Sequence, residues 1–380
     1  MPKKDKDLLY TSIKQYEEAR DADDRERTWI DTDTKFAIDH EGCQWPKDIR
    51  TQREEANPPR PTIVNNKIPE KIDQVDGEFR QLRPSVKVRP VDSKADPQIA
   101  EIYGGIIRHI EYQSNARSAY NTSHTSVLYG GRGAWRIDLE DDEFDPFIRN
   151  IVINRIPNIL TVVFDQYCKK QDRSDARFIF ITEDLPEAVF EAKYPGVPIV
   201  PWNSDEKTWN AWRHEKTITV AEKWWKEKVN REYVQIEDYT GQVYTEAIDK
   251  FKESGKSEKD PYTLNNLDRL EQDGKIIERK TVKEDKIKWA LMTAGQIIKD
   301  EGTGEKINDW PGKYIPIVLQ FGKEVWVEGQ AKVRGMVRFG RGPQEIYNYF
   351  TTKNVEVNAL EPIPPWMVTP SMINKYKDTW

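Results

Sequence analysis

Apolar side chains recur every three or four residues along the first third of the chain, which is the period of an amphipathic helix. This pattern predicts helices over residues 1–35, 68–82 and 116–129. Another helix is expected to begin at Asp96-Pro97, because Asp is a favoured cap and Pro a favoured first helical residue. Its apolar face is formed by Ile99, Ile102, Tyr103, Ile106, Ile107 and Ile110. The prolines within residues 42–65 predict an extended connector.

In the middle of the chain the apolar period shortens to two, which predicts strands. The expected strands are 134–139, 148–156, 161–164, 177–182, 218–239, 276–299 and 314–327. The stretch "RPSVKVRPVD" (83–92) alternates in the same way and predicts one earlier strand bounded by prolines.

Two further helices are expected, a short one at 186–194 and a last one at 343–358. Ile346, Tyr349, Phe350 and Val357 lie on one side of the last helix. The fold class is therefore α+β: amphipathic helices towards the N-terminus, antiparallel strands after them, and one helix near the C-terminus between proline-rich flanks.

Composition restricts the function. The chain has 380 residues, which is more than one ordinary core, and its 13 Trp, 16 Tyr and 12 Phe favour a folded protein with sizeable interfaces. A net charge of −6 is not the charge of a tight DNA clamp. Cys43 and Cys168 match no zinc spacing, and no stretch approaches the length of a membrane span, so we expect neither a metal nor a membrane partner.

The stretch "YGGRGAWRIDLEDDEFD" (129–145) is the first that suggests chemistry, with glycines beside an arginine and a run of carboxylates. A phosphate-binding glycine loop follows a strand and opens a helix, whereas here a helix precedes the glycines and a strand follows. We therefore interpret Gly130, Gly131 and Gly133 as a structural turn, with Trp135 packed inside. The acidic run is interpreted as a solvated hairpin tip; a metal site is the alternative.

A second glycine-arginine stretch, "GMVRFGRG" (335–342), precedes the last expected helix. Its arginines could meet phosphate or acidic side chains of a neighbouring subunit, or form a solvated basic patch. The candidates for subunit or DNA-channel contacts are Arg334, Arg338, Arg341, Gln344, Tyr347 and Asn348. No motif of a serine hydrolase, zinc protease or kinase is present, so we expect no catalytic residue, no cofactor and no enzymatic activity.

Several stretches, taken in order, resemble the portal proteins of P22-like podoviruses. They are "RPSVKVRPVD", "AEIYGGIIRHIEYQSNARSAYNTS", "GGRGAWRIDLEDDEFD", "INRIPNILTVVFD", "DWPGKYIPIVLQFGKEVWVEG" and "GMVRFGRGPQEIYNYF". Against the family pattern, Gly342-Pro343-Gln344 stands where an acidic residue is expected before Pro-Gln, and Thr351-Thr352-Lys353 where an Arg-Ser pair is expected.

The resemblance implies a division of the chain into four parts. Residues 1–60 would be an N-terminal helical and extended arm, 61–330 a wing-like α+β region, 331–360 a stem-like helix region, and 361–380 a proline-rich lead towards the clip. Portals of this type are longer, so we expect this sequence to be the N-terminal part of one, with the remaining clip, stem and crown elements beyond Trp380.

The resemblance also implies a function. Such portals form a dodecameric ring at one capsid vertex of the virion, assembled in the host cytoplasm. Double-stranded DNA passes through the channel during packaging and ejection. The implied partners are the terminase large subunit, the major capsid and scaffolding proteins and, later, the head-tail adaptor proteins. Two alternatives stay open: another capsid-vertex or head-tail adaptor ring protein, and a metal-dependent phage nuclease built on Asp138, Glu140, Asp141, Asp142 and Glu143.

Overall fold

The computed structural model describes residues 3–82, 86–90, 96–142, 145, 147–199, 217–237, 243–248, 271, 275–300 and 302–360. The helices are α1 (Lys3–Ala37), α2 (Lys47–Glu54), α3 (Ile68–Leu82), α4 (Pro97–Gln113), α5 (Ala116–Gly130), α6 (Glu187–Lys193) and α10 (Met336–Leu360). Two short 3-10 turns, η1 (His40–Gly42) and η2 (Ile159–Thr161), accompany them. None of the described helices is long and apolar enough to span a bilayer.

The strands are β1 (Arg132–Asp141), β2 (Arg149–Arg155), β3 (Val162–Phe164), β4 (Phe178–Pro186), β5 (Thr217–Glu237), β6 (Val243–Ala247), β7 (Ile276–Met292), β8 (Ile297–Ile298), β9 (Asn308–Trp310), β10 (Ile317–Phe321), β11 (Lys323–Val327) and β12 (Gln330–Arg334). With antiparallel pairing between them, the described chain is α+β, as predicted. Each predicted strand from residue 134 onward overlaps with at least one strand of the structure, but the stretches expected at 276–299 and 314–327 are each divided into two strands, and β6, β9 and β12 were not predicted.

Two predictions within the first hundred residues are wrong. Residues 86–90, the described part of the strand expected at 83–92, form no strand. Their alternation is not enough, because the bounding prolines lack an N–H and no described strand lies alongside to pair with them. The connector expected over 42–65 contains helix α2, which buries no residue and therefore carries no apolar stripe by which to recognise it.

The chain folds into two compact units, each made of segments that are separate in sequence. Unit 1 comprises Met1–Arg27, Val86–Ser123 and Gly133–Phe321, and unit 2 comprises Thr28–Ser85, His124–Arg132 and Gly322–Trp380. The four-part division given above follows the linear sequence and stays a prediction.

Unit 1 is built on a sheet whose main path is β3-β4-β5-β7-β8, with β6 and β9 paired at its sides. Alternate side chains of β4 point to opposite faces of the sheet. Phe178 and Phe180 pack with Leu9, Ile13 and Tyr16 of α1 in one core cluster. Ile179 belongs to a second cluster, which reaches the smaller sheet β10-β1-β2. The large sheet therefore lies between α1 on one face and the smaller sheet on the other.

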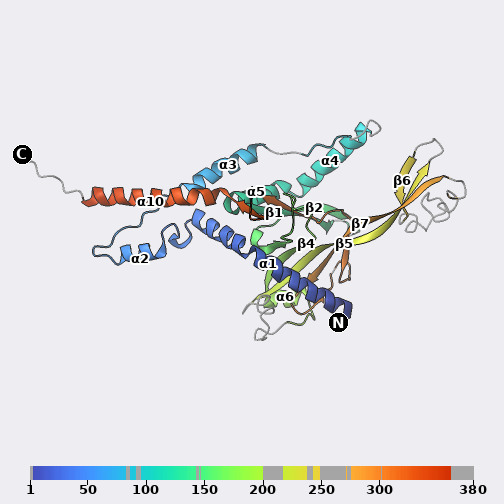
Figure 1. Cartoon of the computed structure of the whole chain (residues 1–380), viewed down its shortest axis with the longest axis horizontal. Coiled ribbons are helices and arrows are strands. Elements are labelled where there is room, and N and C mark those ends of the chain that lie inside the picture. Colours follow the sequence, from blue (N-terminus) through green and yellow to red (C-terminus); the bar gives the residue numbers. More distant parts are fainter. Residues whose placement is uncertain are drawn as a thin grey trace, which may run out of the picture. The chain divides into compact units, whose positions relative to one another are not determined.

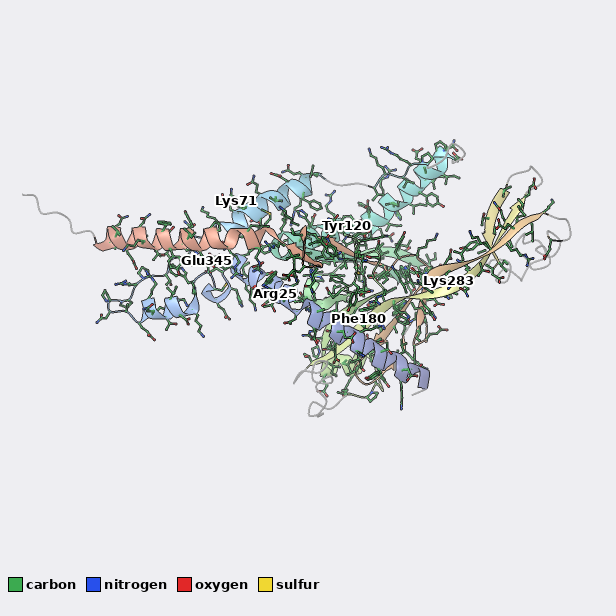
Figure 2. The ribbon with its side chains drawn as sticks, in the orientation of Figure 1. Arg25, Lys71, Tyr120, Phe180, Lys283 and Glu345 are labelled. Atoms are coloured by element: carbon green, nitrogen blue, oxygen red, sulfur yellow. The ribbon has the colours of Figure 1, made fainter. Side chains whose placement is uncertain are left out.

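Strands β5 and β7 continue beyond the rest of their sheet as a long two-stranded arm, which carries β6 near its far end (Figure 1). The arm is charged and mostly exposed, and Lys283 lies along it (Figure 2). Its far end has a small core of its own, formed by Val234, Ile236 and Ile248.

Unit 2 is organised around α10 and α3. Its core consists of Phe36, Ala37, Ile68, Ile72, Leu128 and Val337, contributed by three helices and the first turn of α10. The hairpin of β11 and β12 leads directly into α10.

Candidate subunit and channel contacts on helix α10

Helix α10 begins at Met336, seven residues before the position expected from the sequence. The stretch Gly335–Gly342 is therefore helical apart from its first residue, and it is not a loop that precedes the helix. Gly340 and Pro343 are poor helix formers, which is why the sequence predicted a later start. Tertiary packing outweighs this tendency: Val337 is fully buried, and a Cβ added at Gly340 would lie 3.7 Å from the Ile68 side chain.

Two of the three candidate arginines share one carboxylate of their own chain. Arg338 Nε lies 2.8 Å from Asp33 Oδ2, and Arg341 Nη1 lies 3.1 Å from Asp33 Oδ1. Each guanidinium also lies over an aromatic ring, Arg338 over Trp29 at 4.7 Å and Arg341 over Phe36 at 4.8 Å. These interactions combine charge and stacking, so they hold the first two turns of α10 against the end of α1.

Asp33 itself is buried, with a side chain that is 4% exposed. Burial raises the pKa of this carboxyl group, and the two arginines oppose the rise. Arg334, in contrast, ends β12 and is exposed. It is the member of the arginine group with its side chain most open to solvent.

Gln344, Asn348 and Thr352 form a polar ladder on one face of α10. Their side chains bind the backbone of the extended segment 63–67 in place of a neighbouring strand. Gln344 accepts from Lys67 N at 3.0 Å and donates to Asn65 O at 2.8 Å. Asn348 Oδ1 accepts from Asn65 N at 3.1 Å, and Thr352 Oγ1 accepts from Ile63 N at 3.2 Å.

The ladder is buried and continuous. Its three side chains are 4%, 1% and 1% exposed. Gln344 Nε2 also donates to Asn348 Oδ1 at 2.8 Å, and Asn348 Nδ2 donates to Gln44 Oε1 at 2.9 Å. Because buried amides must be hydrogen-bonded to be tolerated, these bonds explain why the inner face of α10 is polar.

The apolar face of α10 points to solvent. Phe339, Ile346, Phe350 and Val357 are spaced by seven, four and seven residues, so they form one stripe, and they are 55%, 58%, 65% and 50% exposed. Tyr347 lies beside this stripe, 41% exposed, with its hydroxyl 3.3 Å from Asn65 Nδ2. An exposed stripe of large apolar side chains marks an interaction surface.

The glycines after α5 are required by two different constraints. Gly131 has φ +86°, which disfavours any side chain, and a Cβ there would lie 2.7 Å from the backbone carbon of Arg334. Gly133 has no such φ, but its Cβ would lie 2.1 Å from Ser123 O. Gly130 is similarly crowded by Ile30. Trp135 is half-buried and packs edge-to-face on Tyr120 at 5.1 Å.

The described acidic residues after the turn belong to a hairpin of β1 and β2, and several of them bind neighbouring side chains, whereas Glu143 lies outside the described residues. Asp138 accepts from Arg136 and Asn154, Glu140 from Asn154, and Asp141 pairs with Arg149. Among the described residues no three His, Cys, Asp or Glu side chains converge as a metal site would require.

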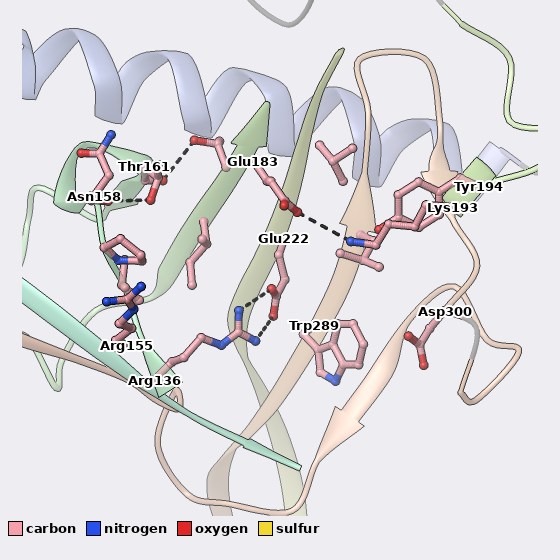
Figure 3. Close-up of a pocket in the computed structure, with 16 residues that line it drawn as sticks. Arg136, Arg155, Asn158, Thr161, Glu183, Lys193, Tyr194, Glu222, Trp289 and Asp300 are labelled. Carbon is pink, nitrogen blue, oxygen red and sulfur yellow. Dashed lines mark hydrogen bonds and ion pairs between the residues drawn. The ribbon is translucent and has the colours of Figure 1, made fainter. Parts of the chain in front are cut away.

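A cavity of about 650 Å³ lies beside this hairpin in unit 1 (Figure 3). Arg136 projects from β1 and forms a bidentate ion pair with Glu222 of β5, with Nη1–Oε2 at 2.9 Å and Nη2–Oε1 at 3.0 Å. Burial opposes the charge of Arg136, but Glu222 and Asp138 raise its pKa above the ordinary value. The described residues that line the cavity include no histidine or cysteine. The Arg136–Glu222 pair ties the two sheets together.

Comparison with known proteins identifies the family. The model of the phage P22-like portal protein matches residues 13–380. The chain belongs to the phage P22-like portal protein family. The portal protein of Acyrthosiphon pisum secondary endosymbiont phage 1 is 24% identical over 297 residues, which is 76% of this chain and 38% of that relative. The chain therefore spans well under half of the portal protein that it matches.

Sequence reasoning did not find the partners of the candidate residues. Nothing in the pattern of α1 singled out Asp33 as the carboxylate for two arginines, because it lies among many charged residues of a long helix. Gln44 was equally hidden. The pair Asn65-Asn66 at the end of the connector was a usable signal, since both side chains make hydrogen bonds to distant residues.

Proposed function

We propose that this chain is the N-terminal part of a portal subunit, which assembles with identical copies into a dodecameric ring at one vertex of the phage capsid. DNA would pass through the ring during packaging and ejection, and the ring would dock the terminase and later the tail adaptors. The observation that carries the proposal is the family match over almost the whole chain.

The exposed stripe of α10 supports the assembly step. Four large apolar side chains on one helix face would cost solubility in a monomer, whereas a neighbouring subunit would cover them. We propose that Phe339, Ile346, Phe350 and Val357 meet the adjacent copy, and that Tyr347 lies at the edge of that contact. On this view Gln344 and Asn348 act indirectly, because they hold α10 in place from inside the chain.

The arginines take different roles in the proposal. Arg338 and Arg341 shape the start of α10 through Asp33, and Arg334 is the member of the group that would meet DNA or an acidic neighbour.

The test is the mass of the purified chain in solution by light scattering, with negative-stain images of the same peak. Phe350→Glu should abolish assembly, because it would bury a charge in the contact. Gln74→Glu is the matched control, since it adds the same charge at an exposed position of α3.

Rings of the wild type and of the control, with monomers of Phe350→Glu, would support the proposal. Rings that persist in Phe350→Glu would contradict the role of the stripe. A monomeric wild type that also stays monomeric when the chain is extended by the C-terminal part of a portal protein would contradict the ring.

A further inference from the structure

A second cavity in unit 1 has a charge opposite to that of the whole chain. Its volume is about 780 Å³, and it lies beside the first turns of α1 where the arm of β5 and β7 begins. Its cationic lining residues are Lys170, Arg177, Lys223, Lys226, Lys228 and Lys313. Asp175 and Asp285 are the acidic ones. The cavity therefore carries four positive charges in excess, six minus two, in a chain whose net charge is −6.

Lys223 is the innermost of these cations. It projects from β5 towards α1 and is 3% exposed. Its ammonium donates to Ser12 Oγ at 2.9 Å and to Gln15 Oε1 at 2.7 Å, which are neutral acceptors. No carboxylate of the described chain lies within ion-pair distance of Lys223. A buried ammonium without a counter-charge is costly, and burial lowers the pKa of Lys223 to about 8.

Two lysines at the mouth of the cavity are also accessible to a ligand. Lys228 and Lys313 are exposed. No described carboxylate lies within ion-pair distance of either, but Glu284 is near enough to Lys313 for their charges to interact. The two acidic residues compensate only in part. Asp175 accepts hydrogen bonds from the backbone N–H groups of Lys169 and Lys170, and Asp285 is exposed opposite Lys228 across the two strands.

The remaining wall of the cavity is mixed, with Thr11, Gln15 and Ser174 as its polar part and an apolar, largely aromatic part beside them. Trp225, Phe178 and Tyr314 line it together with Leu8. Tyr314 is 67% exposed, and the Trp225 ring lies 5.4 Å from the Lys223 ammonium. Apolar walls with a few placed charges are typical of sites that bind a ligand group of matching shape and charge.

We propose that this cavity is a docking site for an acidic peptide segment of a partner protein, with carboxylates on the lysines and an apolar side chain against Trp225 and Tyr314. This goes beyond the proposed portal function and does not depend on ring closure. A peptide fits better than a nucleic acid for two reasons. The arginine of the site, Arg177, is already committed to Asp165 at 2.5 and 3.0 Å, so no guanidinium is left for a phosphate. A long polyanion would also meet the negative field of the whole chain, which a short peptide largely avoids.

The experiment measures binding of a short fluorescein-labelled peptide, in which glutamates flank one phenylalanine, to the purified chain by fluorescence anisotropy. The double variant Lys228→Glu/Lys313→Glu should weaken binding by roughly tenfold, because two attractive contacts become repulsive. The double variant Lys280→Glu/Lys283→Glu changes the net charge equally at exposed positions of β7 outside the cavity, and it should bind like the wild type.

Lys223→Met tests the buried charge separately and should also weaken binding. If this variant does not fold, the double variant Lys228→Glu/Lys313→Glu and its control still test the docking site. Binding that is unchanged in Lys228→Glu/Lys313→Glu, or that falls equally in the control, would overturn the proposal. Preferential binding of a single-stranded oligothymidine of equal charge would overturn it in favour of a nucleic-acid site. The assay needs no rings, so peptide binding by a chain that stays monomeric even when extended by the C-terminal part of a portal protein would contradict the ring while keeping the docking site.

Discussion

Replacing Asn348 by Leu should destabilise unit 2 more than any exposed change on the same helix. Leucine has the same number and branching of side-chain heavy atoms as asparagine but no hydrogen-bonding group, so the change removes all the hydrogen bonds of the side chain. Asn348 accepts from Asn65 N at 3.1 Å and from Gln344 Nε2 at 2.8 Å, and it donates to Gln44 Oε1 at 2.9 Å. Gln344 keeps its bond to Asn65 O. The backbone N–H of Asn65 and the side-chain oxygen of Gln44 lose their partners.

The expected loss follows from these two groups. A buried donor or acceptor left without a partner costs about 1–3 kcal/mol, so Asn348→Leu should lower the free energy of unfolding by about 2–6 kcal/mol. That is a large share of the stability of an ordinary domain. Urea unfolding followed by circular dichroism measures the change. The dependence of the free energy of unfolding on urea concentration must be the same in both proteins for the comparison to hold.

Two matched variants sharpen this experiment. Asn348→Asp keeps the acceptor for Asn65 N, but it replaces the donor to Gln44 with a second acceptor and buries a carboxylate, so its loss should be at least as large as that of Asn348→Leu. Asn354→Leu lies on the same helix at an exposed position and should stay within about 0.5 kcal/mol of the wild type. If Asn348→Leu also stays within that range, the polar ladder does not stabilise α10 and the reasoning fails.

Three further predictions concern single residues. Gly131→Ala should cost at least about 2 kcal/mol by urea unfolding, because φ is +86° and the new Cβ would meet backbone at 2.7 Å, whereas Gly77→Ala, inside α3 with open space around it, should be neutral or slightly stabilising. Equal effects of the two would contradict this account of the turn. The pKa of Lys223 is lowered by burial from 10.5 to about 8, so protonated Lys223 destabilises the fold below pH 8, and the wild type should gain up to about 3 kcal/mol relative to Lys223→Met between pH 8 and 10.5. A constant difference across that range would show that the lysine is not desolvated. Burial would raise the pKa of Asp165, but hydrogen bonds from Arg177 and from backbone N–H groups lower it overall. The stability that Asp165 provides should therefore be complete above its ordinary pKa of 3.8 and be lost below it, so acid unfolding curves of the wild type and Asp165→Asn should converge there; parallel curves would contradict it.

The fold could be predicted where one face of an element is apolar and buried. The expected range of α3 matches the structure residue for residue, because Ile68 and Ile72 are buried at helical spacing. Strand β4 of the large sheet was equally visible, since its alternate residues enter two different core clusters, whereas the short strands β6 and β9 of the same sheet were not predicted.

Helix α10 shows the limit of that reasoning. Its apolar stripe, which a pattern assigns to the core, faces solvent, and its buried face is made of Gln344, Asn348 and Thr352. Periodicity shows only how apolar side chains are spaced. It cannot reveal a buried polar face, in which hydrogen bonds to a distant backbone segment offset the cost of burying the side chains. The candidate residues were therefore correctly located on a helix, while their partners, Asp33 among them, depend on tertiary packing that no local pattern encodes.

The ladder on α10 has a mechanical consequence. Four residues of a helix advance by about 6 Å, and two residues of an extended chain advance by about 6.6 Å, so successive rungs from Gln344 to Thr352 coincide with every second residue of the segment 63–67. A slip of α10 by one residue, about 1.5 Å, would misalign every rung at once. Helix α10 and the segment 63–67 therefore cannot slide past each other one residue at a time. They move as one body, or the helix must release all the rungs together before it can take up a new register.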